Sequence, residues 1–294
     1  IKQGTSLLLH TMGTKNLFVG VGAGNLTTSG VGQNVALGAG ALAAISTGKT
    51  NIAIGANVLG GLTTGNANVG IGDGALLSVG TGASNLVAVG ASALYANTGS
   101  DNTAMGTAAL TANIGGAGNT GMGRLAMYQS ATGNDNTGVG YLTLFNANGG
   151  SNNVAIGSRC GGGVGITSSG SNNTFIGMKV AEADFTGSNS IAIGYDIDMA
   201  SATASNQLNI GNLIFGTGVD GAGTTLSTGN IGIAVKTPVA RLEIIAGTNV
   251  AGTAPLKLNS GTVLSTAVAG VIEFTTDNYF ATITTGPARK AFIL

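Results

Sequence analysis

The sequence predicts an all-β protein built as a parallel β-solenoid of about a dozen coils. Three observations lead to this prediction: a motif that recurs about every 17 residues, an alternation of side-chain types within each copy, and an unusual composition. A repeat of this length is too short for a helical hairpin and suits one solenoid turn with two short strands and two corners. Glycine fills 53 of the 294 positions and charged residues only 7%, against about 7% and 25% in ordinary proteins.

The repeat has the form Asn-x-x-x-Gly. Its glycine recurs at steps of 16 to 20 residues, most of them 17, from Gly20 to Gly211. We assign residues 16–234 to the solenoid, residues 1–15 to an N-terminal connecting segment and residues 235–294 to a separate small β module. At about 4.8 Å per coil, the rod would be roughly 55 to 60 Å long.

Each coil is predicted to turn at two corners. Glycine adopts a positive φ at little cost, so we expect it at one corner. Asparagine is expected at the other corner, where its amide would bond to turn backbone or to the asparagine of the next coil. The glycine corners are Gly38, Gly55, Gly72, Gly106, Gly123, Gly140 and Gly157. The asparagine ladder comprises Asn34, Asn51, Asn68, Asn102, Asn119, Asn136 and Asn153.

Between these corners the side chains alternate with period two. The first and third residues after the asparagine, such as Ile52 and Ile54, are mostly β-branched or apolar, and we predict that they point into the coil. The residue between them is almost always alanine or glycine, which indicates the close approach of another backbone. We therefore predict that this small column faces the axis of a parallel homotrimer. It comprises Ala36, Ala53, Gly70, Ala104, Gly121, Gly138 and Ala155.

Two further segments complete the expected fold. Apolar pairs after the corner glycine, such as Ala41-Leu42 and Val58-Leu59, are predicted to form the second wall of a thin core. Beyond residue 235 the repeat stops and charged residues become more frequent. Residues 240–246, 270–275 and 279–284 are predicted strands, and the last two are expected to form a hairpin around Thr276-Asp277-Asn278.

The charge balance and hydropathy exclude several classes of partner. The chain has 11 basic and 11 acidic residues, so we expect no binding to nucleic acid or to an anionic membrane. No apolar run approaches the ~18 residues of a membrane span. The regular aliphatic positions argue against disorder.

Few residues could carry chemistry, and we predict no catalytic, cofactor or metal site. His10 is the only histidine, so one chain cannot build a histidine-based triad or a multi-histidine metal site. Cys160 lies at a position that neighbouring coils fill with small residues, so we expect it to be buried. Residues 43–50 loosely fit a phosphate-binding loop, but that loop needs a following helix, whereas the next repeat starts at Asn51.

Two groups of residues leave alternatives open. The acidic pairs could bind a cation or flank a sugar, or could simply lie on a solvated bulge. The aromatic residues could stack on sugars or pack beneath the outer loops. The acidic pairs are Glu182/Asp184 and Asp196/Asp198, and the aromatic residues are Tyr95, Tyr128, Tyr141 and Phe145.

The motif Asn-x-Ala-Ile-Gly, as in residues 51–55 and 153–157, resembles the head repeats of trimeric autotransporter adhesins. This resemblance implies a left-handed parallel β-roll that trimerises along its length. Residues 229–244 resemble a join in bacteriophage tail fibre proteins, where such repeats end and a trimeric β module begins. Residues 254–258, 270–274 and 289–290 look like the same fibre family, so the two likenesses cover nearly the whole chain.

These observations lead us to expect a structural and attachment fibre of a virion, a segment of a bacteriophage tail fibre. Its partners would be further copies of itself, other tail or fibre proteins and a host cell-surface glycan or protein. The alternative is a bacterial surface trimeric adhesin head or an extracellular structural filament. An ice-binding solenoid is a third class, which we disfavour because the threonines are predicted to lie at inward positions or in uneven loops.

Overall fold

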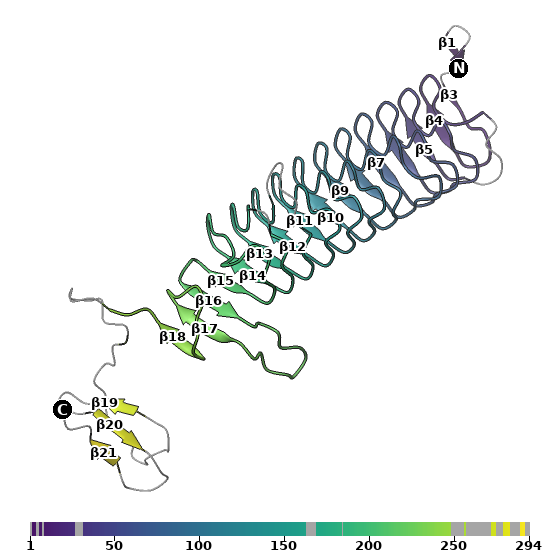
Figure 1. Ribbon diagram of the computed structural model, residues 1–294. Coiled ribbons are helices and arrows are strands. Elements are labelled where there is room, and N and C mark those ends of the chain that lie inside the picture. The colour runs from purple at the N-terminus through teal and green to yellow at the C-terminus, as the bar shows by residue number, and fades with distance from the viewer. Residues whose placement is uncertain are drawn as a thin grey trace. The chain divides into compact units, whose positions relative to one another are not determined.

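The computed structural model describes most of the repeat region and parts of both ends of the chain. The described residues are 2–3, 6–7, 9–26, 32–162, 169–183, 185–247 and 256, together with the backbone of short strands between 272 and 291. They form an all-β structure whose main body is a β-solenoid of about 11 turns (Figure 1). The part of the chain that the structure describes contains no helix capable of spanning a bilayer.

Each coil contributes one three-residue strand to a parallel, in-register sheet. Ile52, Ala53 and Ile54, for example, pair with Val69, Gly70 and Ile71 of the next coil. The strands lie in sequence order along one side of the solenoid (Figure 1). They are β4 (Leu17–Val19), β5 (Val35–Leu37), β6 (Ile52–Ile54), β7 (Val69–Ile71), β8 (Val87–Val89), β9 (Thr103–Met105), β10 (Thr120–Met122), β11 (Thr137–Val139), β12 (Val154–Ile156), β13 (Thr174–Ile176), β14 (Ile191–Ile193) and β15 (Leu208–Ile210).

The corner glycines end these strands, and two constraints make them necessary. Gly38 and Gly106 have φ values of +141° and +139°. A Cβ on Gly38 would also lie 2.2 Å from the carbonyl oxygen of Gly55, the corner glycine of the next coil. Because both the backbone conformation and the spacing of the coils exclude a side chain, this column tolerates only glycine.

The second wall of each coil is made of turns, so the prediction of a second short strand per coil is wrong. Leu59 and Leu110 have left-handed backbones, with φ values of 54° and 51°. Their amides still bond to the next coil, from Leu59 N to Ala75 O at 3.1 Å and from Leu110 N to Ala126 O at 2.9 Å. A left-handed leucine is unfavourable in isolation, and its complete burial offsets that cost.

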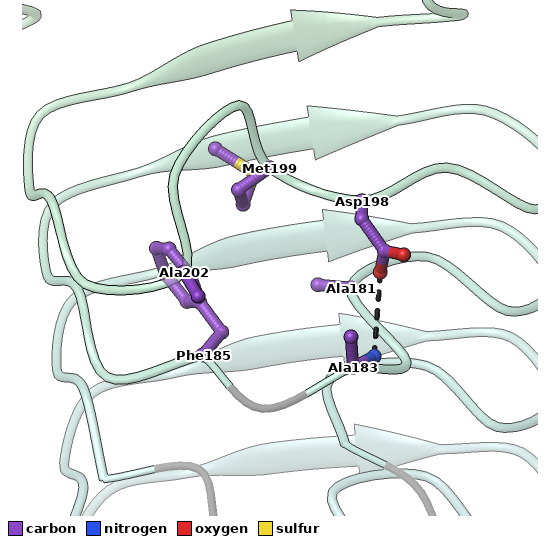
Figure 2. A pocket seen from close by; sticks show the side chains of 6 residues that line it. All are labelled: Ala181, Ala183, Phe185, Asp198, Met199 and Ala202. Carbon is purple, nitrogen blue, oxygen red and sulfur yellow. Dashed lines mark hydrogen bonds between the residues drawn. The ribbon is translucent and has the colours of Figure 1, made fainter.

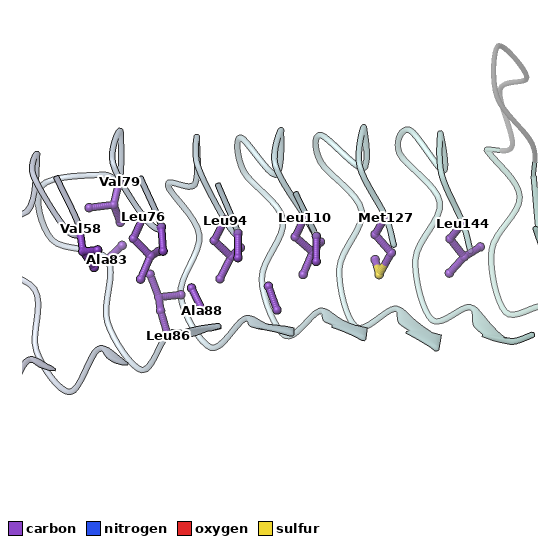
Figure 3. Packing of buried hydrophobic residues seen from close by; sticks show 14 of the residues in the cluster. Val58, Leu76, Val79, Ala83, Leu86, Ala88, Leu94, Leu110, Met127 and Leu144 are labelled. Carbon is purple, nitrogen blue, oxygen red and sulfur yellow. The ribbon is translucent and has the colours of Figure 1, made fainter. Parts of the chain in front are cut away.

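The core lies between the two walls and includes one file of leucine and methionine side chains along the solenoid. Figure 3 shows Leu94, Leu110, Met127 and Leu144 stacked coil upon coil above the strands. All four are almost completely buried. Such a core depends on the neighbouring coils, because each coil is too thin to bury its own side chains.

Antiparallel strands cover both ends of the parallel sheet. β3 (Leu9–His10) pairs with β4 at the N-terminal end. At the other end β16 (Ile214–Thr217) pairs with β15, and β17 (Asn230–Ile233) pairs with β16. β18 (Leu242–Ile244) adjoins β17. These additions occupy edges that would otherwise offer a template for further strands.

The predicted segment boundaries differ from those of the structure. The chain divides into two compact units at Glu243 and Ile244, so the boundary expected at residue 235 falls inside the first unit. Within the second unit, β19 (Ile272–Phe274) pairs antiparallel with β20 (Tyr279–Thr282), which confirms the predicted hairpin, and β20 pairs with β21 (Arg289–Ala291). The expected turn residues 276–278 lie outside the described residues. In the N-terminal segment, β1 (Lys2–Gln3) pairs with β2 (Ser6–Leu7).

Candidate interaction surface

The small column points into the solenoid, and the prediction that it faces a trimer axis is wrong. Ala53 and Ala104 are completely buried within the single chain. A Cβ on Gly138 would lie 3.0 Å from Cγ of Met127, and one on Gly70 would lie 2.5 Å from Cγ1 of Val58. Only a small residue fits at this position because side chains of the second wall, and not a partner's backbone, lie against it. The other members, Ala36, Gly121 and Ala155, are also buried.

Two positions hold phenylalanine in this column, and a glycine makes room for each ring. A Cβ on Gly24 would lie 2.3 Å from the ring of Phe18, and one on Gly161 would lie 3.2 Å from the ring of Phe175. Most other coils carry leucine or methionine where these glycines lie. A large side chain on one wall is therefore matched by a small residue on the other, which keeps the interior close-packed.

The first and third residues of each strand point outward, opposite to the prediction. We call the outward side chains of β4–β15 the sheet face. Every one is leucine, valine, isoleucine, methionine or threonine, and none is charged. Eleven of the larger ones are between 37% and 43% exposed, while Ile191 and Leu208 are half-buried. The eleven are Leu17, Leu37, Ile52, Ile54, Ile71, Met105, Met122, Ile156, Ile176, Ile193 and Ile210.

The sheet face is therefore a continuous apolar surface along the solenoid. Soluble monomers seldom expose apolar patches larger than a few hundred Å². The strand pairing places two outward side chains on every coil, in straight columns. Both are aliphatic in most strands, and one of the two is threonine in β9, β10, β11 and β13. This surface is the main candidate for an interaction site.

The asparagine ladder lies at the corner before each strand, and its side chains are buried. Asn51 donates from N and Nδ2 to Asn34 Oδ1 at 3.0 and 3.1 Å, and also from Nδ2 to Gly65 O at 2.9 Å. The same geometry joins Asn68 to Asn51 and Asn136 to Asn119. Each of these amides thus bonds to the preceding coil and to the corner of the following coil. The backbone N–H groups of Asn119 and Asn153 continue the column, donating to Asn102 and Asn136.

One coil interrupts the ladder. Leu86 lies at the ladder position and donates its N–H to Asn68 Oδ1 at 3.0 Å, but it offers no amide oxygen to the following coil. Asn102 instead donates from Nδ2 to Asn97 Oδ1 at 3.0 Å. An asparagine of the second wall therefore replaces the missing acceptor for the side-chain amide.

Serine residues form a second, outer ladder that the sequence analysis missed. Ser151 N donates to Ser171 Oγ, and Ser171 N donates to Ser188 Oγ, both at 3.0 Å. Ser188 N continues the series to Ser205 Oγ at 2.9 Å. The sequence feature that could have revealed this ladder was a small polar residue two positions before the ladder asparagine in several copies. These bonds join successive C-terminal coils beside the asparagine corner.

We expect that Asn119→Leu will lower the free energy of unfolding by about 2–4 kcal/mol, because it leaves buried donors of Asn136 and the carbonyl of Gly133 without partners. Leu86 shows that leucine fits a ladder position, so a loss would come from hydrogen bonds and not from volume. Urea unfolding followed by circular dichroism measures the change. The exposed Asn148→Ala is the control, and equal stability of the two variants would contradict the expectation.

The residues that could take part in catalysis or metal binding do not lie close together. His10 packs edge-on against Phe18, with ring centroids 5.1 Å apart, and its Nε2 lies 2.8 Å from Ala23 O. Residues 43–50 form turns with no helix following them. Within the described residues, no three His, Cys, Asp or Glu side chains gather as a metal site would require.

The acidic pairs are divided among separate contacts. Glu182 forms an ion pair with Arg159, while Asp196 is exposed. Asp198 accepts a hydrogen bond from Ala183 N at 3.3 Å. Figure 2 shows this bond beside a pocket of about 110 Å³ lined by Ala181, Ala183, Phe185, Asp198, Met199 and Ala202. Asp184 lies outside the described residues. A single carboxylate in a small, largely apolar hollow does not form a pair for acid–base chemistry.

The aromatic residues have two different roles. Tyr128 and Phe145 stack with ring centroids 5.2 Å apart, and Phe145 is buried, so they pack beneath the loops. Tyr95 is half-buried. Tyr141 is exposed, and the Arg124 guanidinium lies 5.5 Å from its ring centroid.

Cys160 is completely buried, as the sequence predicts. Burial raises the pKa of its thiol from 9.0 to about 12, and a backbone hydrogen bond from Ile156 offsets this only in part. We expect no reaction with Ellman's reagent in the folded protein at pH 8, where only about 10⁻⁴ of the thiol is ionised. Full reaction should appear after unfolding in guanidinium. Rapid labelling of the folded chain would contradict this expectation.

No family model, curated protein or solved structure that was compared with this chain matches it.

Proposed function

We propose that this chain is a structural and attachment fibre, a segment of a bacteriophage tail fibre, whose solenoid assembles as a parallel homotrimer through the sheet face. The observation that carries the proposal is the uncharged apolar surface that repeats on every coil. A fibre needs a long and stiff body, which the stacked coils and their hydrogen-bond ladders supply. The virion as location, and other tail or fibre proteins as partners, are supported by the resemblance of residues 229–244.

A second copy of this chain is the occupant that best fits the sheet face. Two copies in parallel have the same coil spacing, so apolar columns can meet coil by coil along the whole solenoid. The absence of charge on this face removes the desolvation cost that would oppose such contact. Parallel copies around a common axis also form a closed assembly. The number three and the left-handed coil are supported by the adhesin resemblance.

The threonines of the strands point outward, so the expectation that they lie inward, which disfavoured ice binding, is wrong. Thr103, Thr120, Thr137 and Thr174 occupy the first position of their strands. The third position of the same strands holds methionine, valine or isoleucine, and the other strands carry aliphatic residues at both positions. Bulky aliphatic columns suit packing against protein better than an ordered array of hydroxyl groups.

Immunogold labelling of the source particles with an antibody to this chain tests the proposed location. Label on thin fibres of a tailed virion is the expected result. Label over a bacterial outer surface without phage would instead favour the adhesin head. Light scattering of the intact chain tests the assembly, and a monomeric mass would contradict the trimer.

We further propose that the fibre has no catalytic activity, because the acidic side chains have separate contacts. Incubation with host polysaccharides should produce no new reducing ends. New ends that disappear in the Asp196→Ala/Asp198→Ala variant would overturn this part of the proposal.

A further inference from the structure

The residue that follows each corner glycine forms an exposed column along one edge of the sheet. Hydrogen bonds between coils keep this column straight: Arg159 N donates to Tyr141 O at 2.8 Å, and Asp196 N donates to Met178 O at 2.9 Å. In the C-terminal coils, from residue 124 to residue 195, the column carries large side chains at every position except Ser158. We call these residues the corner strip: Arg124, Tyr141, Ser158, Met178 and Tyr195.

In the N-terminal coils the same column holds mostly small side chains, although the backbone conformation is the same. There it holds Val21, Ala39, Ala56, Asp73, Ala91 and Thr107, none of them aromatic. The hydrogen bonds of the corner are unchanged, as from Asn57 N to Ala39 O at 2.8 Å. Since the fold does not require large side chains at this position, their presence over the C-terminal coils needs another explanation.

The exposed rings of the corner strip have polar groups beside them. Tyr195 is 66% exposed and Tyr141 is 42% exposed. The Arg124 guanidinium lies over Tyr141, with Nη1 3.4 Å from the tyrosine hydroxyl, and holds that ring in place. The next residue along the chain is Lys179 after Met178 and Asp196 after Tyr195, a donor and an acceptor. The strip therefore offers flat apolar rings flanked by groups that can hydrogen-bond to hydroxyls.

We infer that the corner strip binds a linear cell-surface polysaccharide. Its tyrosines lie in one column three coils apart, about 14 Å at the usual spacing between strands, and Met178 and Ser158 lie between them. A strip one side chain wide is far too narrow for a stable protein interface of about 800 Å² per partner. A linear polymer can follow it, placing the apolar faces of sugar rings on the tyrosines and hydroxyls against the polar side chains.

This inference rests on the proposed function and names the partner of the attachment fibre. Each residue of the corner strip lies two positions after the last outward residue of its strand. The strip therefore lies beside the sheet face and not on it. It would stay accessible when the sheet face is covered by other copies of the chain.

An array of purified bacterial surface polysaccharides, probed with the intact chain, tests the inference. We expect the wild type to bind at least one polysaccharide and Tyr141→Ala/Tyr195→Ala to lose at least tenfold in apparent affinity. Tyr141→Phe/Tyr195→Phe keeps both rings and should retain most of the binding. Ile114→Ala, an exposed apolar residue on an outer loop, is the matched control and should bind as the wild type does.

Three results would overturn the inference: no bound polysaccharide on the array, full binding by the double alanine variant, or a changed oligomeric mass of that variant. The last result would make the corner strip a contact between subunits. Light scattering on the same samples separates this inference from the proposed function. A trimer that binds no polysaccharide refutes only the corner strip, whereas a monomer refutes the assembly.

Discussion

The variant Ala53→Leu/Gly138→Leu is expected to lose about 2–6 kcal/mol of folding free energy. Overpacking a close-packed core costs about 1–3 kcal/mol at each site, and these sites lie in distant coils, so their effects should add. At Gly138 even a Cβ would lie 3.0 Å from Met127 Cγ, so a leucine there has no room. Domains are generally stable by only about 5–15 kcal/mol, and the variant should therefore melt at a much lower temperature.

Circular dichroism during thermal unfolding measures this loss. Thr107→Leu, on an exposed corner, is the control and should melt like the wild type. Adding Met127→Ala to Gly138→Leu should recover part of the stability, because it vacates the space that the new side chain needs. Folded monomers with an unchanged melting temperature would contradict the structure and restore the interpretation that the small column faces a partner.

The repeat and its corners could be predicted because each depends on local chemistry. Only glycine combines the positive φ of Gly38 with a coil carbonyl so close to it. Buried asparagines at a fixed spacing, such as Asn51 and Asn68, indicate amide stacking for the same local reason. These inferences needed no knowledge of which way the strand side chains point.

The direction of the strand faces could not be predicted from alternation alone. A period of two separates the faces but does not say which is inside, and aliphatic residues on one face suggested the wrong answer. The informative signal was that side-chain sizes on the two walls compensate for each other, because Gly24 lies beside Phe18 and Gly161 beside Phe175. The left-handed backbone of Leu59 was equally hidden, because leucine rarely adopts it outside such a tightly packed coil.

The sheet face leads to the second large effect. We expect Ile54→Glu/Ile71→Glu to convert a trimer into folded monomers. The two residues are adjacent in the parallel register, and both are 37% exposed in the single chain. Their replacement should leave each coil intact, because neither side chain belongs to the core. In the assembly, carboxylates would be buried without partners and would repel their copies across the common axis, which costs several kcal/mol.

Light scattering gives the mass, and circular dichroism shows whether the β-structure remains. The control is Ile114→Glu, which introduces the same charge at a side chain 57% exposed on an outer loop, and it should remain trimeric. A trimeric mass for the sheet-face variant would show that these columns are not the interface. A monomeric mass that is accompanied by loss of β-structure would show that the coil folds only within the assembly. That result would contradict the expectation of folded monomers and would mean that the thin solenoid needs its neighbours for the apolar contacts that offset its ordering cost.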